Sequence, residues 1–281
     1  MIVLGFDTST SSTAVALRGA DGSTVSARDD PPPGSHPGHA TRLLALADEL
    51  LARACVGWSD VERIAVGVGP GTFTGLRVGV ATARGLAQSL SVELVAVSSL
   101  QALAAAALAD GRVAAPDAVG GQGAALPSGA GTSAADTAAL ATIDARRGEV
   151  YAAAYAIAGE GESEAESKGG APRELVGAAA LPPQALPGVL ARAQQLARPG
   201  ASWSWLAVGD GALRYREQIE SAGIFVPDDR SPLQLVNGAW ICELGALGTP
   251  SRLHDIGPDY RRRPDAELAL VAARRATSPV S

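Results

Sequence analysis

Residues 2–10 read IVLGFDTST and residues 64–77 read IAVGVGPGTFTGLR, and these two stretches decide the fold. Each is a short apolar run of the kind that forms a buried central strand, and each ends in a turn. In the second stretch, four glycines leave backbone N–H groups uncovered where a helix is expected to begin, which suits an anion or a closely approaching backbone. Their spacing is not the G-x-G-x-x-G of dinucleotide-binding proteins.

The first hundred residues predict an α/β unit. Apolar runs bounded by turn residues predict strands at 2–6, 14–17, 24–27, 64–68 and 94–97. Apolar residues at helical spacing predict helices at 39–54 and 72–90. The last two strands and the second helix form a βαβ unit, which implies a parallel strand pair and a right-handed crossover.

The second half of the chain repeats this order. An apolar strand at 140–144 ends in Asp and is followed by a tight turn and a strand at 150–157, and a strand at 205–208 runs into a glycine turn and a helix. Two such copies indicate a duplicated, two-lobed α/β protein. A helix at 232–247 is expected to close the second lobe.

Two tracts lack the periodicity of packed elements. Residues 114–135 are rich in Ala, Gly, Ser and Pro, and residues 159–172 are acidic and glycine-rich. Such compositions are typical of mobile segments, so we expect two insertions that hold no chemistry.

Composition limits the classes of function. The 281 residues carry a net charge of -6 with a single lysine, which argues against a protein that grips nucleic acid by itself. No apolar run is long enough to cross a bilayer and no signal peptide is recognised at the N-terminus, so the cytoplasm is the expected location. Cys55 and Cys242 are unpatterned and far apart, which fits reduced thiols.

Taken together, DTSTSS from residue 7 and GPGTFTGLRVG from residue 69 resemble the bacterial TsaB (YeaZ) family. The similarity continues through VAVSSL at 95–100, IDARRGEVY at 143–151 and PDYR at 258–261, and weakens in the Ala/Gly-rich middle. The resemblance implies a two-lobed actin/Hsp70-like (ASKHA) fold, duplicated, with a divergent second lobe. It divides the chain into a first lobe at 1–108, completed by 258–281, and a second lobe at 109–257.

The resemblance also implies a function. TsaB proteins are the non-catalytic partners of the related TsaD subunit in making threonylcarbamoyladenosine in the tRNA anticodon loop. A TsaE-like ATPase is then expected in a larger complex, and tRNA would be reached mainly through the partners. Self-association of the isolated chain and nucleotide binding at the joint surface stay open.

Asp7, Thr8 and Ser9, with Gly69 and Gly71, lie where actin-like ATPases hold phosphate and magnesium. We interpret them as vestigial phosphate loops, because the chain shows no second phosphate motif with a catalytic base. The turn at residue 7 would then only satisfy backbone donors. The alternative is an independent ATP-dependent, actin-like phosphotransferase.

No catalytic residue, metal site or cofactor is expected. Ser99 and Leu103 stand where the catalytic TsaD relatives have an H-x-x-x-H metal pair, and leucine cannot ligate a metal. His36 and His39 lie in a Pro/Gly-rich segment without a third ligand. Asp144 and Glu149 fit a charged hairpin better than a general acid and base.

The helix at 72–90 is small or apolar on nearly all sides, as in a helix covered on both faces. Small residues four apart would let another helix approach. The family pairs with TsaD through the helices of this lobe, so the resemblance favours a partner interface; a core helix of a single subunit is the alternative. The expected interface residues are Leu46, Thr72, Phe73, Gly75, Arg77, Gly79 and Ala83.

Overall fold

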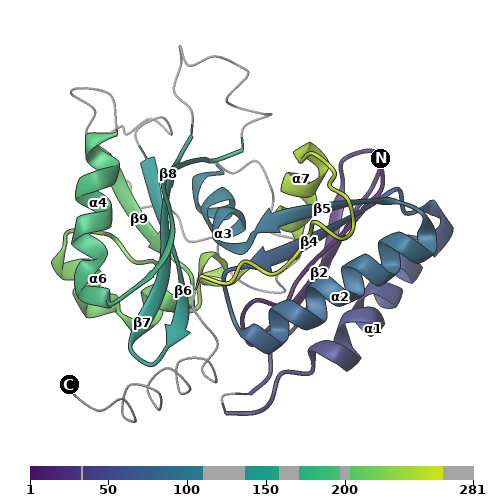
Figure 1. Cartoon of the computed structure of the whole chain (residues 1–281), viewed down its shortest axis with the longest axis horizontal. Helices are drawn as coiled ribbons and strands as arrows, with labels where there is room; N and C mark the ends of the chain where they lie inside the picture. The colour runs from purple at the N-terminus through teal and green to yellow at the C-terminus, as the bar shows by residue number, and fades with distance from the viewer. Residues whose placement is uncertain (33, 110–136, 158–170, 197–202, 262–281) are drawn as a thin grey trace, which may run out of the picture.

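The computed structural model describes residues 1–32, 34–109, 137–157, 171–196 and 203–261. The expected insertion at 114–135 lies outside these residues, as do all but the last two residues of 159–172. Figure 1 shows two α/β lobes side by side, each built on one sheet. The two-lobed α/β architecture expected from the sequence is therefore confirmed. No helix in the described part of the chain is long and apolar enough to cross a membrane.

The first sheet has five strands in the order β3-β2-β1-β4-β5. Their bounds are β1 Val3–Asp7, β2 Thr13–Arg18, β3 Thr24–Asp29, β4 Arg63–Gly69 and β5 Glu93–Ser98. The central strand β1 is antiparallel to β2 and parallel to β4, and β4 is parallel to β5, as the βαβ unit predicted. Helices α1 (His39–Arg53) and α2 (Phe73–Leu90) pack on the outer face of this sheet (Figure 1), and a short 3₁₀ helix, η1 (Trp58–Asp60), precedes β4.

The second sheet repeats the pattern with four strands in the order β8-β7-β6-β9. The strands are β6 Thr137–Arg146, β7 Glu149–Ala156, β8 Arg173–Leu181 and β9 Ser204–Val208. As in the first sheet, the central strand β6 is antiparallel to the next strand and parallel to the last. The outer face is covered by the 3₁₀ helix η3 (Pro183–Ala185) and by α4 (Leu186–Gln195), α5 (Asp210–Arg214) and α6 (Arg216–Ser221).

Two helices lie between the sheets. Helix α3 (Ser99–Leu108) packs on β6, β7 and β9, whereas α7 (Gly238–Leu247) packs on β1, β2 and β4, and the two helices touch each other. Both are apolar on almost every side, as a helix covered on both faces must be. They form one hydrophobic core that joins the lobes.

The structure corrects the expectation for residues 232–247. The segment begins with a 3₁₀ helix, η4 (Pro232–Gln234), α7 begins only at Gly238, and α7 closes the first lobe rather than the second. Gly238 lies against the backbone of β2, and Gly245 lies against Ala65 of β4, each without room for a Cβ atom.

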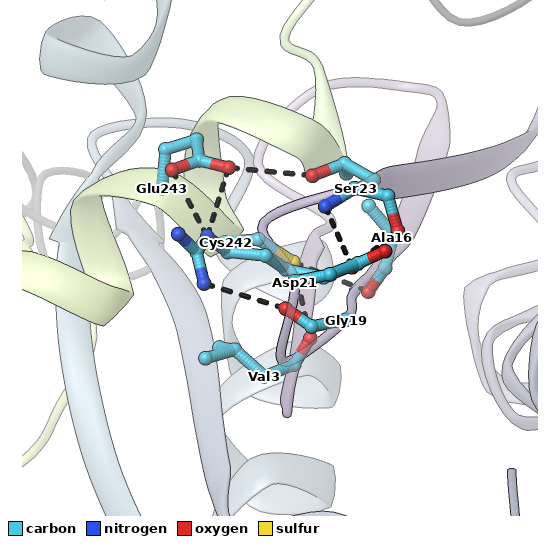
Figure 2. Close-up of polar contacts among 9 residues, drawn as sticks. Val3, Ala16, Gly19, Asp21, Ser23, Cys242 and Glu243 are labelled. Atoms are coloured by element: carbon cyan, nitrogen blue, oxygen red, sulfur yellow. Dashed lines mark hydrogen bonds and ion pairs between the residues drawn. The ribbon is translucent and has the colours of Figure 1, made fainter. Parts of the chain in front are cut away.

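Polar contacts fix α7 on the first sheet (Figure 2). The Cys242 thiol is buried and donates to the carbonyls of Val3 and Ala16 at 3.5 and 3.3 Å, and its burial raises the pKa of the thiol. Glu243 accepts from Arg18 Nε at 3.0 and 3.1 Å and from Thr24 Oγ1 at 3.3 Å. Cys55 is exposed on the first lobe, so the two cysteines do not meet.

The chain then returns along the first sheet. Ser251 N donates to Leu94 O at 3.1 Å, and Asp259 N donates to Val68 O at 2.8 Å. That residues 258–281 complete the first lobe stays a prediction, since the structure describes only 258–261 of them. Arg261 also reaches the second sheet, where its Nη1 donates to Ala178 O at 3.1 Å.

Candidate functional site

The two expected phosphate loops pack directly on each other. Thr72 N donates to Ser9 O at 2.7 Å, and Thr8 Oγ1 donates to Gly75 O at 2.7 Å. Thr8 and Ser9 are fully buried. The structure thus brings the first loop and the glycine loop together, and each loop satisfies polar groups of the other.

The glycines of this segment are explained by that contact. A Cβ atom on Gly71 would overlap Ser9 O, and one on Gly75 would overlap Thr8 O. Gly69 has a φ of +103°, a conformation that favours glycine. The glycines therefore serve a close approach of backbone to backbone, which is one of the two uses their pattern allows.

The Asp7 carboxylate is buried and is used within the protein. Its Oδ1 accepts from Ser9 N at 2.7 Å and from Ser9 Oγ at 2.6 Å, and its Oδ2 accepts from Ser99 Oγ. A Cβ atom on Gly67 would overlap this carboxylate. The oxygens that would bind magnesium in an active phosphate loop are held by hydroxyl and amide donors instead.

His39 lies beside this contact. Its Nδ1 is 2.9 Å from Thr13 Oγ1, and its Nε2, which faces Gly75, has no hydrogen-bond partner among the described residues. Burial lowers the pKa of His39, while the nearby Asp7 acts in the opposite direction. His36 is exposed, so the two histidines do not converge on one site.

The positions of a metal pair in the catalytic relatives are buried core positions here. Ser99 donates to Asp7, and Leu103 belongs to the core between the sheets. Within the ranges that the structure describes, no group of three or more His, Cys, Asp or Glu side chains could hold a metal ion.

The charged hairpin of the second lobe is a structural feature. Asp144 Oδ1 accepts from Arg146 N at 3.0 Å, and its other oxygen lies 3.2 Å from Arg214 Nη1. Asp144 N donates to Asp210 Oδ1 at 2.9 Å, and burial raises the pKa of Asp210. These bonds tie the hairpin to both ends of α5, at Asp210 and Arg214, in agreement with the structural interpretation of Asp144.

Helix α2 has two faces, and the structure separates the expected interface residues between them. The inner face is closed within the chain: Gly75, Gly79 and Ala83 are buried, and a Cβ atom on Gly79 would overlap Thr8 Oγ1. Leu46 of α1 is buried as well. The close neighbour of Gly75 and Gly79 is therefore Thr8 of the chain's own first loop. A partner contact at Leu46, Gly75, Gly79 and Ala83 stays a prediction.

The outer face of α2 is open. Phe73 and Arg77 are exposed and Thr72 is half-buried, so these three expected residues remain on the surface. The face also contains small and polar side chains that sequence reasoning did not select. Its further exposed members are Thr74, Ala81, Arg84, Gly85 and Gln88.

Tyr260 belongs to this surface and was not expected there. Its ring stacks on Phe73 with centroids 5.1 Å apart, and its hydroxyl accepts from Arg77 Nε at 3.0 Å. The Arg77 guanidinium lies 3.8 Å from the centre of the Phe73 ring. The only signal in the sequence was the PDYR motif, which carries no information on its position next to α2.

Sequence comparison finds similarity to proteins of threonylcarbamoyladenosine biosynthesis. A family model described as "TsaD: tRNA N6-adenosine threonylcarbamoyltransferase" matches residues 31–120. The tRNA threonylcarbamoyladenosine biosynthesis protein TsaB of Escherichia coli (strain K12) is 30% identical over 264 residues, which cover 93% of this chain and 95% of that protein. A tRNA N6-adenosine threonylcarbamoyltransferase of Erythrobacter litoralis is 30% identical over 112 residues, or 36% of this chain and 33% of that protein.

Solved structures match over almost the whole length. The structure "YeaZ from Pseudomonas aeruginosa" superposes with a TM-score of 0.62 at 26% identity, and the match covers 92% of this chain and 100% of that one. A second P. aeruginosa structure, described as an uncharacterized protein with similarity to peptidase YEAZ, gives a TM-score of 0.65 at 28% identity, with 93% and 99% covered. Full-length similarity in sequence and in structure shows that this chain belongs to the TsaB (YeaZ) family.

Proposed function

We propose that the chain is a non-catalytic subunit that binds and activates a TsaD-like threonylcarbamoyltransferase, which forms threonylcarbamoyladenosine in the tRNA anticodon loop. Family membership supports a part in threonylcarbamoyladenosine biosynthesis, since the relatives carry that name. The observation that carries the finer proposal is the difference between the two faces of α2. The inner face packs on the first of the two expected phosphate loops, and the outer face is exposed.

The closed inner face supports a non-catalytic role. Asp7 accepts hydrogen bonds from Ser9 and Ser99, and the glycine loop lies directly on the first loop. A phosphotransferase would have to break these contacts before a nucleotide phosphate could enter between the loops. The alternative function therefore has less support from the structure than the subunit role.

The outer face supports a protein partner. Small side chains on an exposed helix let another helix approach closely. Aromatic residues and arginine are the residue types that most often anchor protein–protein interfaces. Phe73 and Tyr260 are 38% and 44% exposed and stack on each other, so this face carries an exposed aromatic pair beside Arg77. We propose that the partner surface consists of Thr72, Phe73, Arg77 and the exposed residues that follow on α2.

The remaining partners follow from the same proposal. A TsaE-like ATPase would join the complex of the two subunits, and tRNA would be bound mainly by the partners because this chain has a net charge of -6. A cytoplasmic location follows for a protein that acts on tRNA. A second copy of this chain could occupy the outer face of α2 when the partner is absent.

Reconstitution tests the proposal. The chain is co-expressed with the TsaD-like protein of the same organism, and the complex is analysed by size-exclusion chromatography with light scattering. We expect a stoichiometric complex that forms threonylcarbamoyladenosine on tRNA when the other pathway components are supplied, and no product when either subunit is left out. Product formation by the TsaD-like protein without this chain, at the rate of the complex, would contradict the proposed activation.

A further inference from the structure

The charge of α2 is one-sided. The helix carries Arg77 and Arg84 on its outer face and contains no acidic residue, although the whole chain has a net charge of -6. The two arginines are seven residues apart, so they point to the same side of the helix, about 10 Å apart along its axis. This face is a positive strip on an acidic protein.

Among the residues that the structure describes, neither arginine of the strip has an acidic partner. In that part of the chain, Arg77 contacts the Phe73 ring and the Tyr260 hydroxyl, and Arg84 forms no ion pair or hydrogen bond. Several other arginines of this chain form ion pairs with its own acidic residues, so the two arginines of the strip differ from them. These pairs are Arg18–Glu243, Arg28–Asp30, Arg42–Asp29, Arg63–Glu93, Arg214–Asp144 and Arg216–Asp229.

The guanidinium of Arg77 is fixed in position by two aromatic side chains. One of its faces lies on the Phe73 ring and its Nε donates to the Tyr260 hydroxyl, which leaves the two terminal nitrogens to bind an anion. A side chain that is already fixed loses less entropy on binding than a free one. The planar group can then hold a carboxylate through two parallel hydrogen bonds.

The side chains beside the two arginines are small, which suits contact with another helix. Ala81 and Gly85 are exposed, and a Cβ atom on Gly85 would meet nothing within 4 Å. A neighbouring backbone can therefore come close to α2 at Ala81 and Gly85, beside the two arginines.

We infer that the outer face of α2 receives one helix of the TsaD-like partner, and that this helix carries two carboxylates about two turns apart, one for Arg77 and one for Arg84. The inference rests on the proposed function and names the chemistry of its interface. A symmetric dimer that packed α2 against α2 would bring four arginines together with no acid on either α2 helix, so the charge pattern of this helix favours a different protein as the occupant.

Charge reversal tests the inference. Arg77→Glu and Arg84→Glu are compared with Arg192→Glu, a matched control on α4 of the second lobe, where the arginine is exposed and forms no ion pair with any described residue. Isothermal titration with the TsaD-like protein at low salt should show the Kd rising about tenfold or more for each of the first two variants, and by less than about twofold for Arg192→Glu. The wild-type affinity should fall as salt is added.

A reciprocal exchange identifies the partner groups. Each exposed acid on the docking helices of the TsaD-like protein is changed to Lys, and one such variant should regain affinity for Arg77→Glu while losing affinity for the wild type. Thermal unfolding shows whether the variants are folded. Arg84 has no hydrogen bond or ion pair to a described residue, so Arg84→Glu keeps the test valid if Arg77→Glu disturbs the packing of Phe73 and Tyr260.

Four results would overturn the inference. Unchanged affinity of both Glu variants would do so and would leave the proposed function standing, whereas absence of binding by the wild-type chain would overturn both. Dissociation of a homodimer by Arg77→Glu, with no effect on the TsaD-like protein, would assign the strip to a second copy. Binding of tRNA by the isolated chain, abolished by the same variants, would assign it to RNA.

Discussion

Thr8 and Gly79 are in direct contact: the Thr8 hydroxyl, which donates to Gly75 O, lies where a Cβ atom of residue 79 would stand. This contact seats the middle of α2 on the loop that follows β1. The same loop holds Asp7 and Ser9, so the packing of the helix and the hydrogen bonds of Asp7 and Ser9 depend on one loop conformation. Substitutions at these positions should therefore change stability before they change partner binding.

Gly79→Ala should lower the free energy of unfolding by about 1 to 3 kcal/mol, because the added methyl group overpacks the contact with Thr8. Gly85→Ala is the matched control on the same helix. Its Cβ would meet nothing within 4 Å, so it should raise the free energy of unfolding by about 0.5 to 1 kcal/mol through helix propensity. Urea titration measures both, and equal effects of the two substitutions would show that residue 79 is not confined.

Asp7→Ala should lower the free energy of unfolding by about 2 to 4 kcal/mol, because three buried donors, on Ser9 and Ser99, lose their acceptor. The purified wild-type chain should show no ATP hydrolysis. Turnover of ATP by the wild type that Asp7→Ala abolishes without loss of stability would favour the phosphotransferase instead.

The buried imidazole of His39 should make stability depend on pH. Burial lowers its pKa in the folded state below the ordinary 6.5, so the unfolded chain binds a proton more readily than the folded one. The contribution is fully present above about pH 6.5, and the free energy of unfolding decreases as the pH falls below that value. His39→Asn, which keeps a polar atom near Thr13, should flatten this decrease between pH 7 and 5.

His36→Asn serves as the control for that experiment, because His36 is exposed in the same segment. It should leave the dependence of unfolding free energy on pH as in the wild type. An identical slope for wild type and His39→Asn would contradict the assignment of this dependence to His39.

The elements with strong local patterns were predicted from the sequence. The apolar run of β1 and the glycine turn after β4 identify central strands, and the spacing of apolar residues identifies α1 and α2 within one or two residues. Strand β8 was not predicted, because its sequence RELVGAAAL consists largely of small residues with little alternation between apolar and polar positions.

Less of the candidate site could be predicted from the sequence. A pattern of small or apolar residues shows that a helix face is covered, but it does not show which part of the protein covers it. Gly75 and Gly79 predict a close approach, and a Cβ atom on either glycine would overlap Thr8 of the first loop. Helix α2 has small residues on both sides, so its outer face at Ala81 and Gly85 could not be told from its inner one. The place of α7 on the first sheet depends on contacts more than 200 residues apart in the chain, such as Cys242 with Val3.

Substitution at Ala81 tests the central claim most directly, that the exposed face of α2 binds the TsaD-like subunit. Ala81 is exposed near the middle of that face. Ala81→Trp places a large ring in the proposed helix contact, and overpacking of about 1 to 3 kcal/mol corresponds to a loss of affinity of about 5- to 150-fold. We predict this loss in isothermal titration with the TsaD-like protein, with an unfolding midpoint that is unchanged. Wild-type affinity of Ala81→Trp would contradict the account and move the interface to another surface.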